Sequence, residues 1–114
     1  MASPPTTPRV AVVGVGQTTH ARHRPDVDYA ELALEAIDEA LADAGIGLLD
    51  LDHAVTASQD FVDGRTIASM STAEVTGSYL KPESRLCGDG TNAVLYALAK
   101  MRTGQLRFGL VLAH

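Results

Sequence analysis

The chain has 114 residues and a mass of 12.0 kDa, with 46% hydrophobic and 20% charged side chains, a composition typical of a single globular domain. Fourteen acidic residues against nine Lys and Arg give a net charge of -5, which disfavours nucleic acid as a partner. One Cys and four scattered His predict no disulfide and no metal site. No apolar run is long enough to cross a bilayer and no secretory signal is evident, so we expect a cytoplasmic protein without a membrane span.

The first quarter of the chain predicts a flexible start, one strand and a long loop. Residues 1–8 hold three prolines, which cannot propagate a helix or a central strand, and residues 9–114 form the domain. The β-branched run 10–15 shows no alternation, which predicts a strand buried on both faces of a parallel sheet. Residues 16–27 have no apolar period and predict an exposed connection.

The clearest helix signal follows this loop. Asp28 and Glu31 stand at the spacing of a capping box, and Ala, Leu and Ile then recur at helical spacing as far as residue 44. Gly45 is placed to terminate that helix. Residues 53–57 are short and rich in β-formers, so they predict a second parallel strand.

The second half of the chain predicts two helices and two strands. A short helix is expected within 66–75, a strand at 84–86, a helix at 91–101 and a last strand at 108–113. The helix at 91–101 is apolar nearly all round and is therefore predicted to be buried. Two helices cannot cover four strands, so we expect a further segment or another chain to cover the remaining sheet.

The single cysteine is the most informative residue for chemistry. Cys87 stands between a predicted strand and a predicted helix, and the turn Gly88-Asp89-Gly90 follows it directly. A thiol at the positive end of a helix is stabilised as thiolate, and glycines let a carbonyl group approach the backbone. Most free cysteines are simply small buried hydrophobic residues. From the residues alone, both interpretations of Cys87 stay open.

Three segments together resemble the N-terminal part of a thiolase of the sterol-carrier-protein type. They are the run 10–16, the helix end at 40–45, and 86–90 with the Ala-rich helix that follows. The resemblance implies an α/β layered fold, a mainly parallel sheet with helices on both faces, of which this chain holds only the first part of the N-terminal half. It also implies that Cys87 accepts an acyl group from a coenzyme A thioester such as a 3-oxoacyl-CoA, with no covalently bound cofactor, in a homodimer.

Asp89 departs from the family pattern, because thiolases commonly carry a small uncharged residue there. One interpretation is an ordinary helix N-cap. The other is altered chemistry, as in thiolase-like retro-aldolases that cleave a side-chain acyl-CoA, steroid-derived ones included, without an acyl-enzyme. Members of that branch often need a small partner protein that contains zinc or an OB-fold.

The length of the chain is the second departure. In thiolases the activating His, the second Cys and the oxyanion groups belong to later segments, so the resemblance implies that this chain alone is inactive. The missing groups are expected from the remainder of a thiolase polypeptide or from a complementary chain. A non-catalytic subunit or fragment, whose free strand edge serves assembly, is the remaining alternative.

Two further motifs give weaker signals. Arg22 and Arg24, interleaved with His20 and His23, are candidate contacts for a coenzyme A phosphate, although an ordinary solvated loop has the same composition. No third ligand for a metal accompanies the two histidines. The sequence Asp-Gly-Arg at 63–65 predicts a turn, either at a subunit interface by the family resemblance or as an ordinary surface turn.

Overall fold

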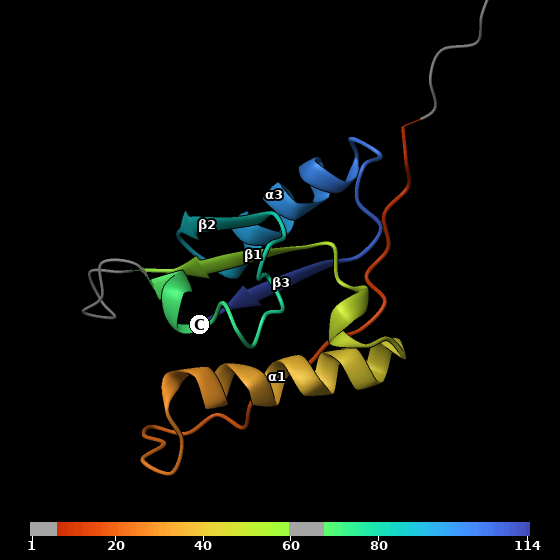
Figure 1. The fold of residues 1–114 in the computed structure, drawn as a ribbon. Coiled ribbons are helices and arrows are strands. Elements are labelled where there is room, and N and C mark those ends of the chain that lie inside the picture. Colours follow the sequence, from red (N-terminus) through yellow and green to blue (C-terminus); the bar gives the residue numbers. More distant parts are fainter. Residues whose placement is uncertain (1–6, 60–67) are drawn as a thin grey trace, which may run out of the picture.

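The computed structural model describes residues 7–59 and 68–114, which form a parallel sheet between two helices (Figure 1). The three strands lie in the order β2-β1-β3. One helix lies on each face of the sheet (Figure 1). No helix in these described residues has the length and apolar character needed to span a membrane. The elements in chain order are α1 (Tyr29–Ala44), η1 (Leu48–Asp50), β1 (His53–Ser58), η2 (Ala68–Ser71), β2 (Glu83–Cys87), α3 (Gly90–Met101) and β3 (Gly109–Ala113).

Helix α1 begins and ends at the residues that the sequence indicates. The Asp28 side chain accepts a hydrogen bond from the backbone N–H of Glu31 at 2.8 Å, and the Glu31 carboxylate accepts one from the N–H of Asp28 at 2.8 Å. At the other end Gly45 adopts φ 71° and donates its N–H to the carbonyl of Leu41 at 2.9 Å. The predicted capping box and C-terminal glycine are thus confirmed.

Two small cores lie on opposite faces of the sheet because alternate residues of β1 point to opposite sides. On the α1 face the buried side chains are Ala33, Ile37, Leu51, Ala54, Leu110 and Leu112. On the α3 face they are Val55, Ala57, Ala93 and Ala97. The two alanines of α3 let that helix approach the strands closely, since a small side chain leaves little between helix and sheet.

The strand predicted at 10–15 is wrong. The run is extended but belongs to no sheet, and the exposed fractions of Val12, Val13 and Val15 are 79%, 57% and 66%. The end of this run contacts α1 instead. The N–H of Val15 donates to the Asp43 carboxylate at 2.9 Å, and Gly16 lies so close to the helix that a Cβ there would overlap the helix backbone. Strands β1 and β3 therefore pair directly, and the described sheet has three strands rather than four.

The complete burial predicted for the helix at 91–101 is also wrong. Helix α3 buries Ala93 and Ala97 against the sheet, but Val94 and Leu95 are 48% and 59% exposed. Small residues face the strands and larger ones face outward, the reverse of the usual amphipathic order. The outer face of α3 is therefore an uncovered apolar surface in this chain.

Between β1 and β2 the structure describes residues 59 and 68–82, which form no α-helix and no strand. Residues 68–71 form the 3-10 helix η2 and turns follow, so the short α-helix predicted within 66–75 does not form in the described part of that range. Hydroxyl groups tie the segment to the sheet: Thr76 donates to Ser78 at 3.0 Å, and Ser78 donates to the Glu83 carboxylate at 3.0 Å. The segment is thus held by hydrogen bonds rather than by the regularly spaced apolar residues that would pack an α-helix against the sheet.

Candidate functional site

Cys87 lies at the carboxyl end of β2, at the edge of the sheet where open α/β proteins bind their ligands. It is a free and exposed thiol. Ser58, the last residue of β1, is its register partner in the neighbouring strand. The ladder continues on the other side of β1, where the N–H of His114 donates to the carbonyl of Ala57 at 3.4 Å. Three strand ends therefore meet at this edge.

The turn after Cys87 brings the predicted supporting residues together. Gly88 has φ 152°, a conformation that side chains rarely adopt, so glycine suits the sharp change of direction. The Asp89 carboxylate accepts a hydrogen bond from the N–H of Asn92 at 3.1 Å and caps α3. A Cβ at Gly90 would stand 3.1 Å from Cβ of Ala113, so this glycine lets the turn pack against the end of β3. The N-cap interpretation of Asp89 is confirmed.

Sequence analysis missed Ser58. Its side chain is 2% exposed, and its Oγ atom has no hydrogen-bond partner. Ala57 and its register partner Leu86 both pack in the core under α3, so the next residues along, Ser58 and Cys87, point to the opposite face together. The available signal was a hydroxyl residue at the end of a buried strand, but only the register places it beside the thiol.

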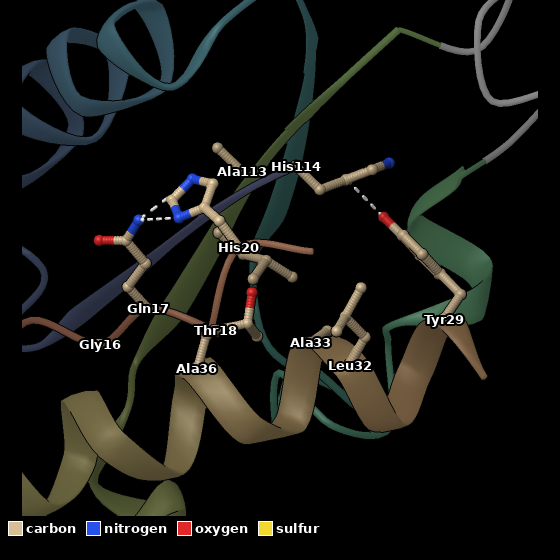
Figure 2. Close-up of a pocket in the computed structure, with 11 residues that line it drawn as sticks. Gly16, Gln17, Thr18, His20, Tyr29, Leu32, Ala33, Ala36, Ala113 and His114 are labelled. Carbon is tan, nitrogen blue, oxygen red and sulfur yellow. Dashed lines mark hydrogen bonds between the residues drawn. The ribbon is translucent and has the colours of Figure 1, made fainter. Parts of the chain in front are cut away.

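A pocket of about 260 Å³ opens at the same edge (Figure 2). Residues 16–20, one face of α1 and the end of β3 form its walls. Tyr29 Oη lies 2.7 Å from His114 Nδ1, with the two rings edge to face, and Gln17 Nε2 lies 3.1 Å from His20 Nδ1. Apolar side chains of α1 and β3 and polar side chains from residues 17–20, Tyr29 and His114 share the lining. The lining residues are Gly16, Gln17, Thr18, His20, Tyr29, Leu32, Ala33, Ala36, Leu112, Ala113 and His114.

The pocket and the turn after Cys87 are neighbours, because Ala113 lines the first and packs against Gly90 of the second. The thiol, the glycine turn and the pocket thus share one edge of the sheet. Cys87 and Ser58 are not among the lining residues, and the strand order places β1 between Cys87 and the pocket at the end of β3. A pocket with apolar lining at this edge is suited to an apolar group of a ligand.

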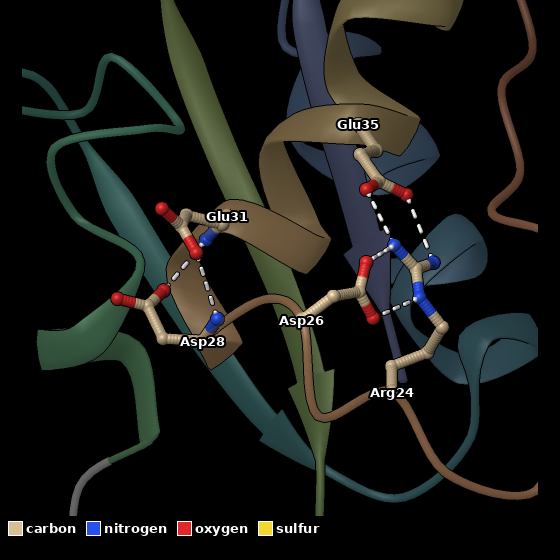
Figure 3. A network of polar contacts seen from close by, with 5 residues as sticks. All are labelled: Arg24, Asp26, Asp28, Glu31 and Glu35. Carbon is tan, nitrogen blue, oxygen red and sulfur yellow. Dashed lines mark hydrogen bonds and ion pairs between the residues drawn. The ribbon is translucent and has the colours of Figure 1, made fainter.

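Arg24, a candidate contact for a coenzyme A phosphate, is already paired with two carboxylates (Figure 3). Its guanidinium donates to Asp26 at 2.9 and 3.0 Å and to Glu35 at 2.8 and 3.1 Å. The bonds to Asp26 and then to Glu35 raise the pKa of Arg24, and those from Arg24 lower the pKa of both carboxyls. Arg22 is exposed on the same loop. Pairing with Asp26 in the loop and with Glu35 in α1 leaves Arg24 few donors for a phosphate.

The opposite, amino-terminal edge of the sheet has a different electrostatic character. The Asp52 carboxylate accepts hydrogen bonds from the N–H groups of Phe108 at 3.0 Å and Arg107 at 2.6 Å, which lower the pKa of Asp52. Burial lowers the pKa of His53, and the nearby Lys100 lowers it further. His53 is 1% exposed and neither ring nitrogen has a hydrogen-bond partner. The Asp52 carboxylate thus joins the start of β1 to the residues just before β3.

Within residues 7–59 and 68–114, no three His, Cys, Asp or Glu side chains group closely enough to hold a metal ion. His20 contacts Gln17, whereas the neighbouring His23 is exposed. The turn predicted at 63–65 lies outside the described residues. Comparison of the chain with protein-family models and with curated proteins finds no match.

Proposed function

We propose that this chain is part of a thiolase-like acyltransferase that acts on coenzyme A thioesters and carries the acyl group on Cys87. The observation that supports the proposal most is the position of the thiol: it is exposed at the carboxyl end of a parallel strand and precedes a glycine turn and the N-terminus of α3. The resemblance of 86–90 to the thiolase nucleophile segment supplies the reaction class. No covalently bound cofactor is needed for this chemistry.

The proposed reaction has two half-reactions. The Cys87 thiolate attacks the 3-oxo carbon of a 3-oxoacyl-CoA. The bond between this carbon and carbon 2 then breaks, and the carbanion that leaves takes a proton to become acetyl-CoA. The acyl group on sulfur then passes to the thiol of a second coenzyme A, and Cys87 is restored.

The base and the second Cys of this cycle are proposed to come from the remainder of the polypeptide or from a complementary chain, in a homodimeric enzyme. The exposed apolar face of α3, with Val94 and Leu95, supports a larger assembly, because an isolated domain gains nothing from exposing such a surface. By this proposal the chain described here turns over no substrate by itself.

The test is the mass of the protein, purified with any chain that co-purifies, before and after incubation with acyl-CoA and 3-oxoacyl-CoA thioesters. We expect an acyl adduct that is present in the wild type and lost in Cys87→Ala. Consumption of substrate without an adduct would favour a retro-aldolase, especially if a small zinc- or OB-fold-containing protein co-purifies. A chain that neither reacts nor binds would favour a non-catalytic subunit or fragment.

A further inference from the structure

We propose that the hydroxyl group of Ser58 donates a hydrogen bond to the carbonyl oxygen of the acyl group while that group is transferred to Cys87. The inference rests on the proposed function and deepens it, because it assigns to a residue of this chain one of the oxyanion donors that thioester chemistry needs. Ser58 would touch the reacting carbonyl and is, in that sense, a catalytic residue.

The first reason is the unusual state of the Ser58 hydroxyl. Its side chain is 2% exposed and its Oγ atom meets no acceptor or donor. A buried hydroxyl without a partner destabilises a fold by about 1–3 kcal/mol, so such groups are uncommon and call for an explanation. A donor that is unpaired at rest and paired when an oxyanion forms is one such explanation.

The second reason is its position. Ser58 and Cys87 are register partners on adjacent strands, so their backbones lie about 4.8 Å apart. Their side chains point to the same face, since the preceding pair, Ala57 and Leu86, packs on the opposite one. An acyl carbonyl bonded to the sulfur of Cys87 therefore forms within the reach of a hydroxyl on the neighbouring strand.

Thr56 provides an internal comparison. It lies two residues earlier on β1, on the same face, and its Oγ atom is also buried without a partner. Its register partner is Arg85, not Cys87. Both hydroxyls bear the cost of burial, but only that of Ser58 adjoins a nucleophile, so only Ser58 is assigned the role.

Ser58 contributes to the acylation of Cys87, which an ester can also carry out. The Cys87 thiol loses its proton to a buffer base, its sulfur bonds to the carbonyl carbon of an ester, and the carbonyl electron pair moves to oxygen. The Ser58 hydroxyl hydrogen-bonds that oxyanion without transferring its proton. Collapse of the intermediate expels the leaving group of the ester, which is p-nitrophenolate for p-nitrophenyl acetate, and leaves a thioester on Cys87.

The experiment compares two reagents on the purified protein together with any co-purifying chain. Acylation by p-nitrophenyl acetate passes through an oxyanion, whereas alkylation by iodoacetamide displaces iodide from a saturated carbon and forms none. We expect Ser58→Ala to slow acylation of Cys87 about 100-fold. Alkylation should stay within about twofold, because it needs no oxyanion donor. Ser58→Thr, which keeps a hydroxyl, should retain most of the acylation rate.

The matched control is Thr56→Val, which removes a buried unpaired hydroxyl from the same strand and face and should leave both rates unchanged. Equal slowing of both reagents in Ser58→Ala, or acylation as fast as wild type, would overturn the role of Ser58 alone. Absence of acylation in the wild type by ester and acyl-CoA alike would overturn the proposed function with it. If Ser58→Ala does not fold by circular dichroism, Ser58→Val, which lacks the hydroxyl and has a high strand propensity, is compared with Ser58→Thr, which has the same shape.

Discussion

Two regions of the molecule hold the groups that sequence analysis singled out for ligand binding, and they differ in whether those groups are already bonded. Around Cys87 the thiol is exposed and the neighbouring hydroxyl of Ser58 has no partner. In the loop before α1, Arg24 is held by the carboxylates of Asp26 and Glu35. A functional group is available to a ligand only when its bonding capacity is not met within the fold. This difference favours the Cys87 edge as the site.

The two regions also differ in what fixes their conformation. The turn after Cys87 is set by backbone geometry at Gly88 and by the Asp89 cap of α3. The loop of residues 16–27 is fixed to α1 by close backbone contact at Gly16 and by ion pairs further along. Substitutions at these anchors should therefore affect the two regions separately.

The largest effect is expected at Gly16. A Cβ on this residue would overlap the backbone of Ala36 and Ala40 in α1, and backbone atoms cannot move aside as a flexible side chain can. We expect Gly16→Ala to lower the free energy of unfolding by about 1–3 kcal/mol in urea titration. The control is Gly47→Ala, whose Cβ would meet only Asp50 at 3.6 Å. Equal effects of the two variants would contradict the close contact between loop and helix.

The Asp89 cap is expected to contribute somewhat less. Asp89→Ala removes the acceptor for the N–H of Asn92 and should lower the free energy of unfolding by about 1 kcal/mol. Asp89→Ser preserves a capping oxygen and should be close to neutral in stability. If Asp89→Ser also leaves the acylation rate of Cys87 unchanged, the carboxylate has no part in the chemistry and its role is the cap.

Features that depend on residues close together in the sequence could be predicted, and features that depend on distant residues could not. Local patterns predicted the capping box of α1, the turn at Gly88-Asp89-Gly90 and all three observed strands, since these rest on neighbouring residues. The run 10–15 has strand composition, yet strand pairing is decided by distant segments, and here β1 pairs with β3 instead. The pairing of Arg24 with Glu35, eleven residues away, was likewise beyond local reasoning.

The candidate site shows the same limit. Cys87 and its glycine turn could be predicted because their spacing on either side of a strand end is a local feature. Ser58 was missed because its proximity to Cys87 follows from the register of two strands, and its lack of a partner follows from burial. Neither the register nor the burial can be predicted from the residues next to Ser58 in the sequence.

A smaller effect is expected from His53, the buried unpartnered group at the other end of β1. Because burial lowers its pKa in the folded protein, the unfolded chain binds more protons as the pH falls below about 6.5. Stability should therefore decrease between about pH 7.5 and pH 5.5, before most carboxyls titrate. Urea midpoints at both pH values test this, and His53→Asn should reduce the difference. A wild-type midpoint that rises over this interval would contradict the burial of a neutral His53.

The smallest effect is expected from Arg24. Its ion pairs with Asp26 and Glu35 are exposed to solvent, so Arg24→Gln should lower the melting temperature only slightly, and less at high salt. Acylation of Cys87 by p-nitrophenyl acetate and by acetyl-CoA should be unaffected, as in the control Arg9→Gln at an exposed position outside the loop. A loss confined to acetyl-CoA would show that Arg24 leaves its carboxylates to bind the coenzyme A phosphate, which would remove the contrast between the two regions.

The most direct test of the central claim is whether the acyl group on Cys87 can be transferred to coenzyme A. The protein, with any co-purifying chain, would be acylated with isotopically labelled acetyl-CoA, freed of reagent, and exposed to unlabelled coenzyme A. The account predicts that label leaves Cys87 and appears as acetyl-CoA, since a double-displacement intermediate must react in both directions. An adduct that persists in the presence of coenzyme A, or one that forms equally in Cys87→Ala, would contradict it.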